Sequence, residues 1–509
     1  MKRASGILLP LFSLPSKRGR GDMGPEAYRF IDKLSMAGQR YWQVLPIGPA
    51  NDKDCPYQST SAFAGDPAYI SLEKLEQRGL LDADRLSFAK ANRSASSRDE
   101  VLRSAYLSFR LRGSGEELRA FDLFCEKEAE WLDDFALYTA LSDRLGRDWS
   151  RWDEDISRCR EEAKAYWRDE LSEEIGFRRW LQFEFFTQWE DLRAYAHEKG
   201  VRVIGDIPYS VAFESADCWA DRRLFRIDEE GNQTETSGVP PDQFTPKGQC
   251  WNNPLYDWNV HREDGYRWWI RRISQQLRFF DILRIDHIRG FESYYAIPGD
   301  DRDPMRGHWE KGPGMDFFGE VNRIFGSDRF IAEDLGFLTQ QVHDMIRDTG
   351  YPGMKVLQFA FDTSEENIYL PSNYEDNNCA VYTGTHDNDT TLGWYEKAEE
   401  WKKRFLTWYL REKSCTRFSK DRADLSGGSG EDPGIMDPED AVRGMVELAY
   451  SSRADICIIP MQDHLGLGSH ARINTPGVAD GNWRWQMDED AFTDELAEGL
   501  KALCREYDR

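Results

Sequence analysis

The sequence predicts an α/β protein, a (β/α)8 TIM barrel with large helical and loop insertions and no C-terminal β-sandwich domain. Short apolar runs alternate with helical segments, a pattern typical of a parallel sheet. There are eight such runs, the number of strands that closes a barrel of this kind. Acidic segments stand where several runs end, and barrel enzymes hold their catalytic groups at the C-terminal ends of the strands.

The apolar runs are spaced unevenly along the chain. They are residues 6–11, 41–47, 201–207, 282–286, 330–333, 354–361, 380–385 and 455–461. About 150 residues separate the second run from the third, far more than one crossover helix needs. We therefore predict a mostly helical insertion over residues 70–190, where Arg, Glu, Leu and Trp recur at helical spacing.

A second insertion is expected between the third and fourth runs, over residues 209–275. It carries the segment 238–256, in which Pro240 and Pro241 fix an extended backbone and stop a helix, so we expect this loop to project. Only about 50 residues follow the eighth run, and a β-sandwich needs about 100. Residues 1–509 are therefore predicted to form a single catalytic barrel.

Composition and charge narrow the classes of function. The net charge of −25 at pH 7 argues against nucleic acid, because phosphate binding needs basic patches. Nine scattered cysteines form no CxxC pair, which favours a reducing, cytoplasmic location over a disulfide framework or a zinc ribbon. No stretch approaches the ~20 apolar residues of a membrane span, and Pro10 breaks the N-terminal run, which we interpret as a strand. The 18 tryptophans mildly favour a sugar ligand, since sugar C–H faces stack on aromatic rings.

Three acidic segments hold the candidate catalytic groups. They place Asp286 after 282–285, Glu333 after 330–332 and Asp387 after 380–385. Because the ends of parallel barrel strands meet on one face, we expect these three carboxylates to converge there. Enzymes that cleave a glycosidic bond usually place one carboxyl group on each side of that bond. A sugar-handling enzyme is therefore the leading hypothesis.

The first two segments each have a structural alternative. Arg284 and Asp286 are two apart in a strand and share a face, so the guanidinium would keep the carboxylate ionised, as a nucleophile requires. Alternatively, the two residues form a purely structural ion pair. Glu333 against apolar walls would have a raised pKa and act as a proton donor. Alternatively, it caps the helix that follows.

The third segment, residues 385–390, is dense in polar side chains. Asp387 could stabilise a developing positive charge, and His386 could donate a hydrogen bond to a sugar hydroxyl. His386, Asp387 and Asp389 could instead bind a metal ion, but no second His-rich segment completes such a site. We therefore predict neither a metal nor a cofactor.

Taken together, these segments resemble a known family. Leu-Arg-Ile-Asp-His at 283–287, Ala-Glu-Asp-Leu-Gly at 332–336 and Gly-Thr-His-Asp-Asn-Asp-Thr at 384–390 are similar to those of 4-α-glucanotransferases, the amylomaltase or disproportionating-enzyme family. Further similar segments are 13–16, 56–58, 205–208, 238–242, 251–256, 462–463, 465–468 and 482–485. The resemblance runs from the first strand nearly to the C-terminus.

The resemblance implies a transferase that acts on α-1,4-glucans by a retaining double displacement. The expected donors are maltooligosaccharides, amylose, and starch or glycogen branches, and the acceptor is glucose or another glucan. The implied roles are nucleophile for Asp286, acid/base for Glu333, transition-state stabiliser for Asp387, sugar contacts for Asp206, Arg284 and His386, and a donor-side aromatic for Tyr57. Asp242, Gln249 and Trp251 lie in the projecting loop, over which long glucans are expected to bend.

Several rival functions stay open from sequence alone. An α-amylase-type hydrolase would share the three carboxylates but would be expected to carry a C-terminal β domain and a calcium cage. A silent glucan-binding protein predicts the loss of a carboxylate, and a metal-dependent barrel enzyme is a third possibility. Transfer requires that the acceptor outcompete water, and Tyr57, Phe244 and Trp251 are the candidate apolar cover. Gln243 and His464 depart from common family patterns and bear on chain-length preference.

Overall fold

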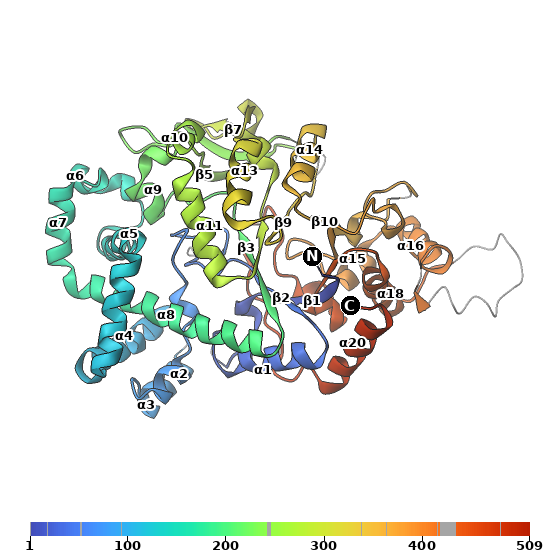
Figure 1. Ribbon diagram of the computed structural model, residues 1–509, viewed down its shortest axis with the longest axis horizontal. Coiled ribbons are helices and arrows are strands. Elements are labelled where there is room, and N and C mark those ends of the chain that lie inside the picture. The colour runs from blue at the N-terminus through green and yellow to red at the C-terminus, as the bar shows by residue number, and fades with distance from the viewer. Residues whose placement is uncertain are drawn as a thin grey trace, which may run out of the picture.

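The computed structural model describes residues 2–17, 19–50, 53–92, 94–241, 246–336, 338–362, 364–414, 416–417, 434–478 and 480–509. Eight parallel strands close into a barrel at the centre of the molecule, in the order β1-β12-β11-β10-β9-β6-β3-β2 (Figure 1). Their bounds are β1 Ala4–Leu8, β2 Tyr41–Gln43, β3 Arg202–Ile207, β6 Ile282–Ile285, β9 Phe330–Ala332, β10 Gly353–Val356, β11 Cys379–Tyr382 and β12 Ile456–Pro460. All eight predicted runs are strands of this barrel, which confirms the predicted fold class.

The sixth strand is shorter than the apolar run that predicted it. β10 ends at Val356, and Leu357–Phe359 form a 3-10 helix. Gln358 leaves the strand direction, and its Nε2 donates a 2.8 Å hydrogen bond to the Asp389 carbonyl. The run therefore ends as a strand just before Gln358, whose side chain supports the loop after β11.

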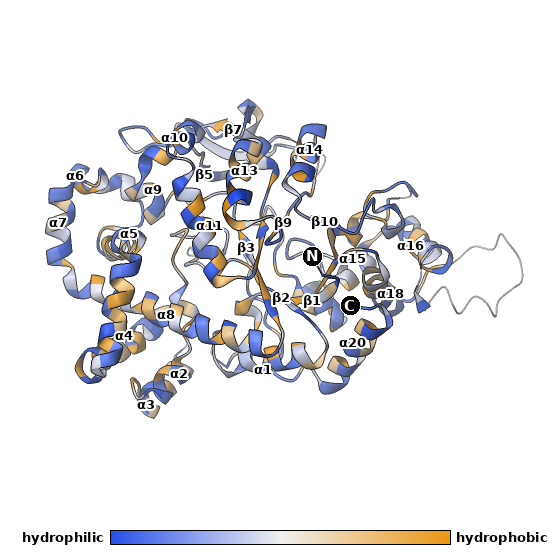
Figure 2. Cartoon of the chain, in the orientation of Figure 1, coloured by the Kyte–Doolittle hydropathy of each residue, from blue (hydrophilic) through white to orange (hydrophobic). Residues whose placement is uncertain are grey.

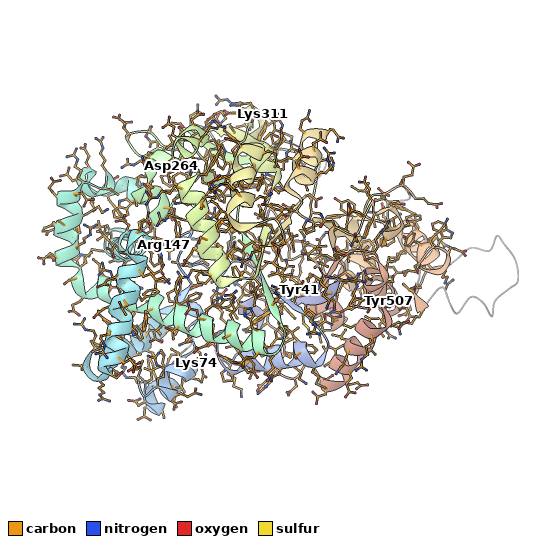
Figure 3. All side chains as sticks on the ribbon, viewed as in Figure 1. Tyr41, Lys74, Arg147, Asp264, Lys311 and Tyr507 are labelled. Carbon is orange, nitrogen blue, oxygen red and sulfur yellow. The ribbon has the colours of Figure 1, made fainter. Side chains whose placement is uncertain are left out.

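Apolar side chains fill the inside of the barrel. Alternate strand residues point inwards, and the buried inner set is Ala4, Leu8, Tyr41, Ile204, Ile282, Ile331, Met354, Val356, Ala380, Tyr382, Ile456 and Ile458. The strands are largely hydrophobic while the surrounding helices turn hydrophilic faces outward (Figure 2). Side chains fill the space between the barrel and these helices (Figure 3). Since the interior is packed, polar chemistry is confined to the ends of the strands.

The chain between β2 and β3 is mostly helical and lies on one side of the barrel (Figure 1). Its helices are α2 Leu72–Gln77, α3 Ala83–Ala91, α4 Ala95–Arg112, α5 Gly115–Leu145, α6 Glu154–Ser157, α7 Glu161–Glu170 and α8 Ser172–Glu198. The side-chain amide of Gln182 on α8 exchanges two 2.9 Å hydrogen bonds with the Gly65 backbone. A Cβ at Gly65 would lie 2.1 Å from the Phe185 ring, so only glycine lets the chain lie this close to α8. Helix α8 thus fixes the loop after β2, which carries Tyr57.

A second sheet is built from two separate parts of the sequence. Its strands are β4 Glu235–Val239, β5 Gln249–Pro254, β7 Ser293–Pro298 and β8 His308–Lys311, antiparallel in the order β5-β4-β7-β8. The β4–β5 hairpin therefore pairs with strands that follow β6. Sequence reasoning predicted a projecting loop here but not this sheet, because the pairing joins segments on both sides of a barrel strand.

The other helices of four or more residues pack around the barrel or connect its strands. They are α1 Pro25–Met36, α9 Ala216–Ala220, α10 Trp258–Glu263, α11 Arg267–Phe279, α12 Arg289–Glu292, α13 Gly314–Phe325, α14 Gln340–Thr349, α15 Thr391–Lys397, α16 Glu400–Glu412, α18 Pro438–Ser451, α19 Met461–His464 and α20 Asp494–Glu506. Within the described residues no strand follows β12, and no helix has the length and apolar character needed to cross a membrane.

Candidate active site

The end of β6 places Arg284 and Asp286 on the same side of the strand, as predicted. The Arg284 side chain is buried, and its Nη1 lies 3.0 Å from Asp286 Oδ1 and 2.6 Å from Asp206 Oδ2. Burial alone lowers the pKa of Arg284, but the two carboxylates raise it well above its usual value, so the guanidinium stays charged. The Asp286 N–H donates to the Ile207 carbonyl of β3 at 3.1 Å, which ties the residue to the barrel ladder.

Glu333 immediately follows β9 and is partly exposed. Its Oε2 accepts the His287 backbone N–H at 2.7 Å, and its Oε1 accepts the Leu335 N–H at 3.1 Å. Burial raises the pKa of Glu333 to about 8, and the charge of Asp286 adds to the rise. The two N–H donors and Arg284 lower this pKa, but by less. A carboxyl group with this pKa carries its proton at neutral pH and is able to act as an acid.

The residue after Asp286 is held in an unusual backbone conformation. His287 has φ +49°, the left-handed region that a residue with a side chain rarely adopts. This turn directs its N–H to Glu333, and the Trp251 ring packs edge-on against the imidazole at 5.2 Å. Burial lowers the pKa of His287 to about 4, so this ring is neutral.

Asp387 lies beyond the end of β11, in the loop that leads to α15. Its side chain is 47% exposed, whereas the side chain of the adjacent His386 is 4% exposed. His386 Nε2 lies 3.4 Å from Asp387 Oδ2. On the other oxygen, Asn474 Nδ2 donates a 2.6 Å hydrogen bond to Asp387 Oδ1. This carboxylate is open to a ligand on one side and held on the other.

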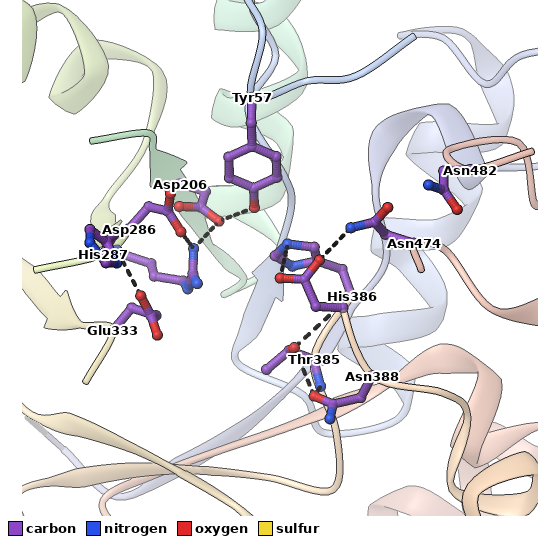
Figure 4. A network of polar contacts seen from close by, with 12 residues as sticks. Tyr57, Asp206, Asp286, His287, Glu333, Thr385, His386, Asn388, Asn474 and Asn482 are labelled. Carbon is purple, nitrogen blue, oxygen red and sulfur yellow. Dashed lines mark hydrogen bonds and ion pairs between the residues drawn. The ribbon is translucent and has the colours of Figure 1, made fainter. Parts of the chain in front are cut away.

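Tyr57 links the two halves of the site. Its hydroxyl donates a 2.7 Å hydrogen bond to Asp206 Oδ2, and its ring stacks on His386 at 5.2 Å and 18°. Burial raises the pKa of the Tyr57 phenol well above its usual value, and nearby carboxylates, Asp286 and Asp387 among them, add to the rise. Asp286 and Glu333 lie on one side of Tyr57 and His386 and Asn474 on the other (Figure 4). Residues from all three predicted segments therefore lie around Tyr57.

The projecting segment contributes Gln249 and Trp251 on β5. Trp251 Nε1 donates to Gln249 Oε1 at 3.2 Å, so the two side chains support each other. Asn253, at the end of the same strand, accepts a 2.9 Å hydrogen bond from Gln58 Nε2, next to Tyr57. Asp242, and with it Gln243 and Phe244, lies outside the described residues.

Comparisons with known proteins decide the family. A sequence model described as 4-alpha-glucanotransferase matches residues 9–491. The chain belongs to the 4-alpha-glucanotransferase family. It is 41% identical over 515 residues to the 4-alpha-glucanotransferase of Thermus thermophilus, covering 100% of this chain and 99% of that protein. It is 39% identical over 508 residues to that of Clostridium butyricum, covering 98% and 99%.

A solved structure agrees with this assignment. The amylomaltase of Streptococcus agalactiae, determined in complex with acarbose, superposes with a TM-score of 0.91 at 33% identity and covers 100% of both chains. The resemblance inferred from the three acidic segments is thus confirmed over the whole length of the chain. The predicted enzyme class, a 4-alpha-glucanotransferase, follows from the family.

Sequence reasoning missed part of this glucanotransferase site. Arg472 and Asn474 contact the Asp387 segment from a loop about 85 residues away in the sequence. Neither residue follows a barrel strand, and both stand between two segments that signalled the family, 465–468 and 482–485. The hydrogen-bonding residue types were a signal, but no spacing rule connected them to Asp387.

Other predicted polar residues have structural roles. The metal alternative grouped Asp389 with His386 and Asp387, but Asp389 Oδ2 instead accepts from Lys397 Nζ at 2.6 Å and Ser469 Oγ at 2.8 Å. Asp463 is buried, and its two oxygens accept three hydrogen bonds from Thr383 and Thr391. Both residues support the loop after β11 rather than the open space of the site.

One group of potential metal ligands lies elsewhere, on the second sheet. Glu235, His308 and Glu310 each place one donor atom within 4.8 Å of the other two. Among the described residues, this is the set of side chains that could hold a metal ion. Arg226 forms ion pairs with both of these glutamates. The oxygens of both glutamates therefore already take part in an ion-pair network on this sheet.

Proposed function

We propose that this 4-alpha-glucanotransferase moves a segment of an α-1,4-glucan to the 4-hydroxyl of glucose or another glucan by a retaining double displacement. The observation that best supports the proposal is the contrast between two neighbouring carboxyl groups. Asp286 faces the Arg284 guanidinium at 3.0 Å, and Glu333 has a pKa of about 8. Retaining enzymes need one ionised and one protonated carboxyl group, with their carboxyl groups about 5–5.5 Å apart.

In the first step Asp286 attacks the anomeric carbon of the donor. Glu333 donates its proton to the departing glycosidic oxygen, so a C–O bond forms as another breaks and the leaving glucan is released as a neutral alcohol. Asp286 becomes an ester and loses its negative charge. The charge of Asp286 helps to raise the pKa of Glu333, so its loss lowers that pKa.

In the second step Glu333, now ionised, removes the proton of an incoming sugar 4-hydroxyl. That oxygen displaces Asp286 from the anomeric carbon, and the configuration is retained after two inversions. Both carboxyl groups return to their starting states. The drop in the pKa of Glu333 between the steps lets one residue serve first as acid and then as base.

The remaining side chains are assigned to the sugar and its positive charge. Asp387, half exposed beside the site, would stabilise the positive charge that develops on the ring. His386 and Arg284 would contact sugar hydroxyls, and Asp206 would hold Arg284 and Tyr57 in place. Hydrogen bonds to sugar hydroxyls that strengthen in the transition state contribute several kcal/mol in such enzymes.

Transfer requires the acceptor to outcompete water for the glucosyl ester. The rings of Tyr57 and His386 are stacked, and Trp483 packs against both at a tilt, with centroids 5.2 to 6.0 Å apart. These three rings line one side. Trp251 extends from the second sheet towards His287 on the other. We propose that a bound glucan, stacked on Tyr57 and Trp251 and contacted by Gln249 and Asp242, displaces water from this space.

We assign α-1,4-glucans as donors, including maltooligosaccharides, amylose and the outer branches of starch or glycogen, and glucose or another glucan as acceptor. The acarbose complex of the Streptococcus agalactiae amylomaltase supports an oligosaccharide ligand. We further propose a cytoplasmic location. The eight cysteines of the described residues are free thiols, the state that a reducing compartment maintains.

Incubation with maltotriose tests the function. Transfer produces glucose and longer maltodextrins while the total of reducing ends stays constant. The matched control is Asp286→Asn, which keeps the size of the side chain and removes the nucleophile. A rise in reducing ends in the unmodified protein would assign it to hydrolysis, and unchanged maltotriose would leave it a glucan-binding protein.

A further inference from the structure

We propose that Asn474 is a positioning residue that holds Asp387 in its reactive orientation. The inference rests on the proposed function, because it assumes that Asp387 faces the charge developing on the sugar. Asp387 follows β11 by five residues and has a half-exposed side chain, so the barrel ladder does not fix it. Its orientation must therefore come from groups outside the strand.

The loop at 472–483 supplies these groups. Asn474 Nδ2 donates to Asp387 Oδ1 at 2.6 Å, and the Asn474 backbone N–H donates to the His386 carbonyl at 3.1 Å. Arg472 Nη2 donates to the Asp387 carbonyl at 2.6 Å. Both the side chain and the backbone of the Asp387 segment are thus held by one loop. Figure 4 shows Asn474 of this loop beside His386.

The loop is itself closed by internal hydrogen bonds. Arg472 Nε donates to the Asn474 carbonyl at 2.6 Å, and the Asn482 side chain accepts from the Thr475 N–H at 2.9 Å and donates to the Val478 carbonyl at 2.9 Å. Trp483 follows directly and packs on Tyr57 at 5.9 Å. The same loop therefore contacts Asp387 and Tyr57, on two sides of the space where the sugar would bind.

The hydrogen-bonding groups of Asn474 and Asp387 indicate which atom of Asn474 positions the carboxylate. An ionised carboxylate only accepts hydrogen bonds, so the amide must offer its NH₂ group. A hydrogen bond to a charged group is about twice as strong as one between neutral groups. The Asn474 amide occupies Oδ1, while Oδ2 lies on the His386 side at 3.4 Å from Nε2. Without this bond the half-exposed carboxylate is free to rotate, and a misplacement of about 1 Å costs about 100-fold in rate.

The test is a double-mutant cycle with the variants Asn474→Ala, Asp387→Ala and the double variant. Each is assayed for transfer from an α-glucosyl fluoride donor, because fluoride leaves with little acid assistance. Asn474→Ala is expected to lower kcat about 10- to 100-fold with KM within about twofold, because positioning affects the transition state more than binding. In the Asp387→Ala background the same substitution should change kcat less than twofold, since the group it positions is gone. A structural defect would instead lower kcat equally in both backgrounds.

A matched control separates fold from positioning. Asn322 on α13 also makes two side-chain hydrogen bonds, to the Thr349 carbonyl at 3.1 Å and from the Tyr351 hydroxyl at 2.7 Å. Asn322→Ala should lower the melting temperature and leave kcat as in the unmodified protein. If Asn474→Ala does not fold, the Asn474→Asp variant is assayed in its place. This substitution keeps the size of the residue and replaces the NH₂ donor by a carboxylate that repels Asp387. Its kcat should fall at least as far.

Two results would overturn the inference. The first is an Asn474→Ala variant that keeps more than half of the unmodified kcat while Asp387→Ala is inactive on maltotriose. The second is a loss that persists undiminished in the Asp387→Ala background. A fully active Asp387→Ala variant would instead contradict the role of Asp387 in the proposed function, so the two failures are distinguishable.

Discussion

The two sides of the active site hold their carboxyl groups by different means. On the β6–β9 side, the N–H groups of Asp286 and Glu333 donate to carbonyls of the neighbouring strands at 3.1 and 3.0 Å. On the β11 side, Asp387 lies beyond the strand and is held by a loop near the C-terminus. The side assigned to covalent chemistry is thus fixed by the barrel backbone, whereas the side assigned to charge stabilisation is fixed by side chains.

The largest expected effect is on the barrel-held side. Asp286→Asn should lower transfer by at least about 10⁴-fold, because the covalent step loses its nucleophile. The melting temperature should change little, since the Asp286 side chain is 26% exposed and the fully buried Asp206 still pairs with Arg284. Transfer from maltotriose, followed as released glucose, measures the effect. A variant that turns over at the unmodified rate would refute the assignment of the nucleophile.

Glu333→Gln should show a loss that depends on the leaving group. With maltotriose, the rate should fall about 10³-fold because the amide cannot donate a proton to the glycosidic oxygen. With α-glucosyl fluoride, formation of the covalent intermediate should stay within about tenfold of the unmodified rate, since fluoride leaves without that proton. An equal loss with both donors would show that Glu333 is not the acid.

Asp206 and Asp387 differ in exposure, so their substitutions should affect stability differently. Asp206→Asn removes a charge that Arg284 contacts at 2.6 Å in a buried site, so unfolding free energy should fall by about 3 kcal/mol along with activity. Asp387→Asn removes a half-exposed charge, so activity should fall about 100-fold or more with little change in stability. Thermal unfolding of both variants measures the change in stability, and their transfer rates measure the change in activity. A loss of stability in Asp387→Asn equal to that in Asp206→Asn would remove the distinction between the two sides.

The last prediction concerns a pH-dependent change in stability. The pKa of Glu333 is about 8 in the folded protein against 4.5 for an ordinary glutamate, so the stability it contributes is fully present below pH 4.5 and is lost as the pH rises to 8. Glu333→Gln has no such group. Its melting temperature relative to the unmodified protein should therefore increase between pH 4.5 and 8 and level off above. A difference that does not vary with pH would contradict the raised pKa.

Much of this arrangement could be predicted from the sequence because local patterns carry it. Apolar runs gave the eight strands, and carboxylates at their ends gave Asp286 and Glu333, whose positions depend on the strands themselves. The second sheet and the loop at 472–483 could not be predicted in this way. Both depend on contacts between distant segments, β4 with β7 and Asn474 with Asp387, and no periodicity records such a pairing.

The central claim is that Asp286 forms a covalent bond to the donor sugar while Glu333 acts as acid and then base. The most direct measurement uses the Glu333→Gln variant, incubated with an α-glucosyl fluoride donor and digested for peptide mass spectrometry. We expect the Glu333→Gln variant to carry a glucosyl adduct on the peptide that contains residue 286. The unmodified protein should carry no such adduct when glucose or maltose is present as acceptor. An adduct on another carboxylate would contradict the role of Asp286. So would the absence of any adduct, if the unmodified protein transfers sugar with inversion of configuration.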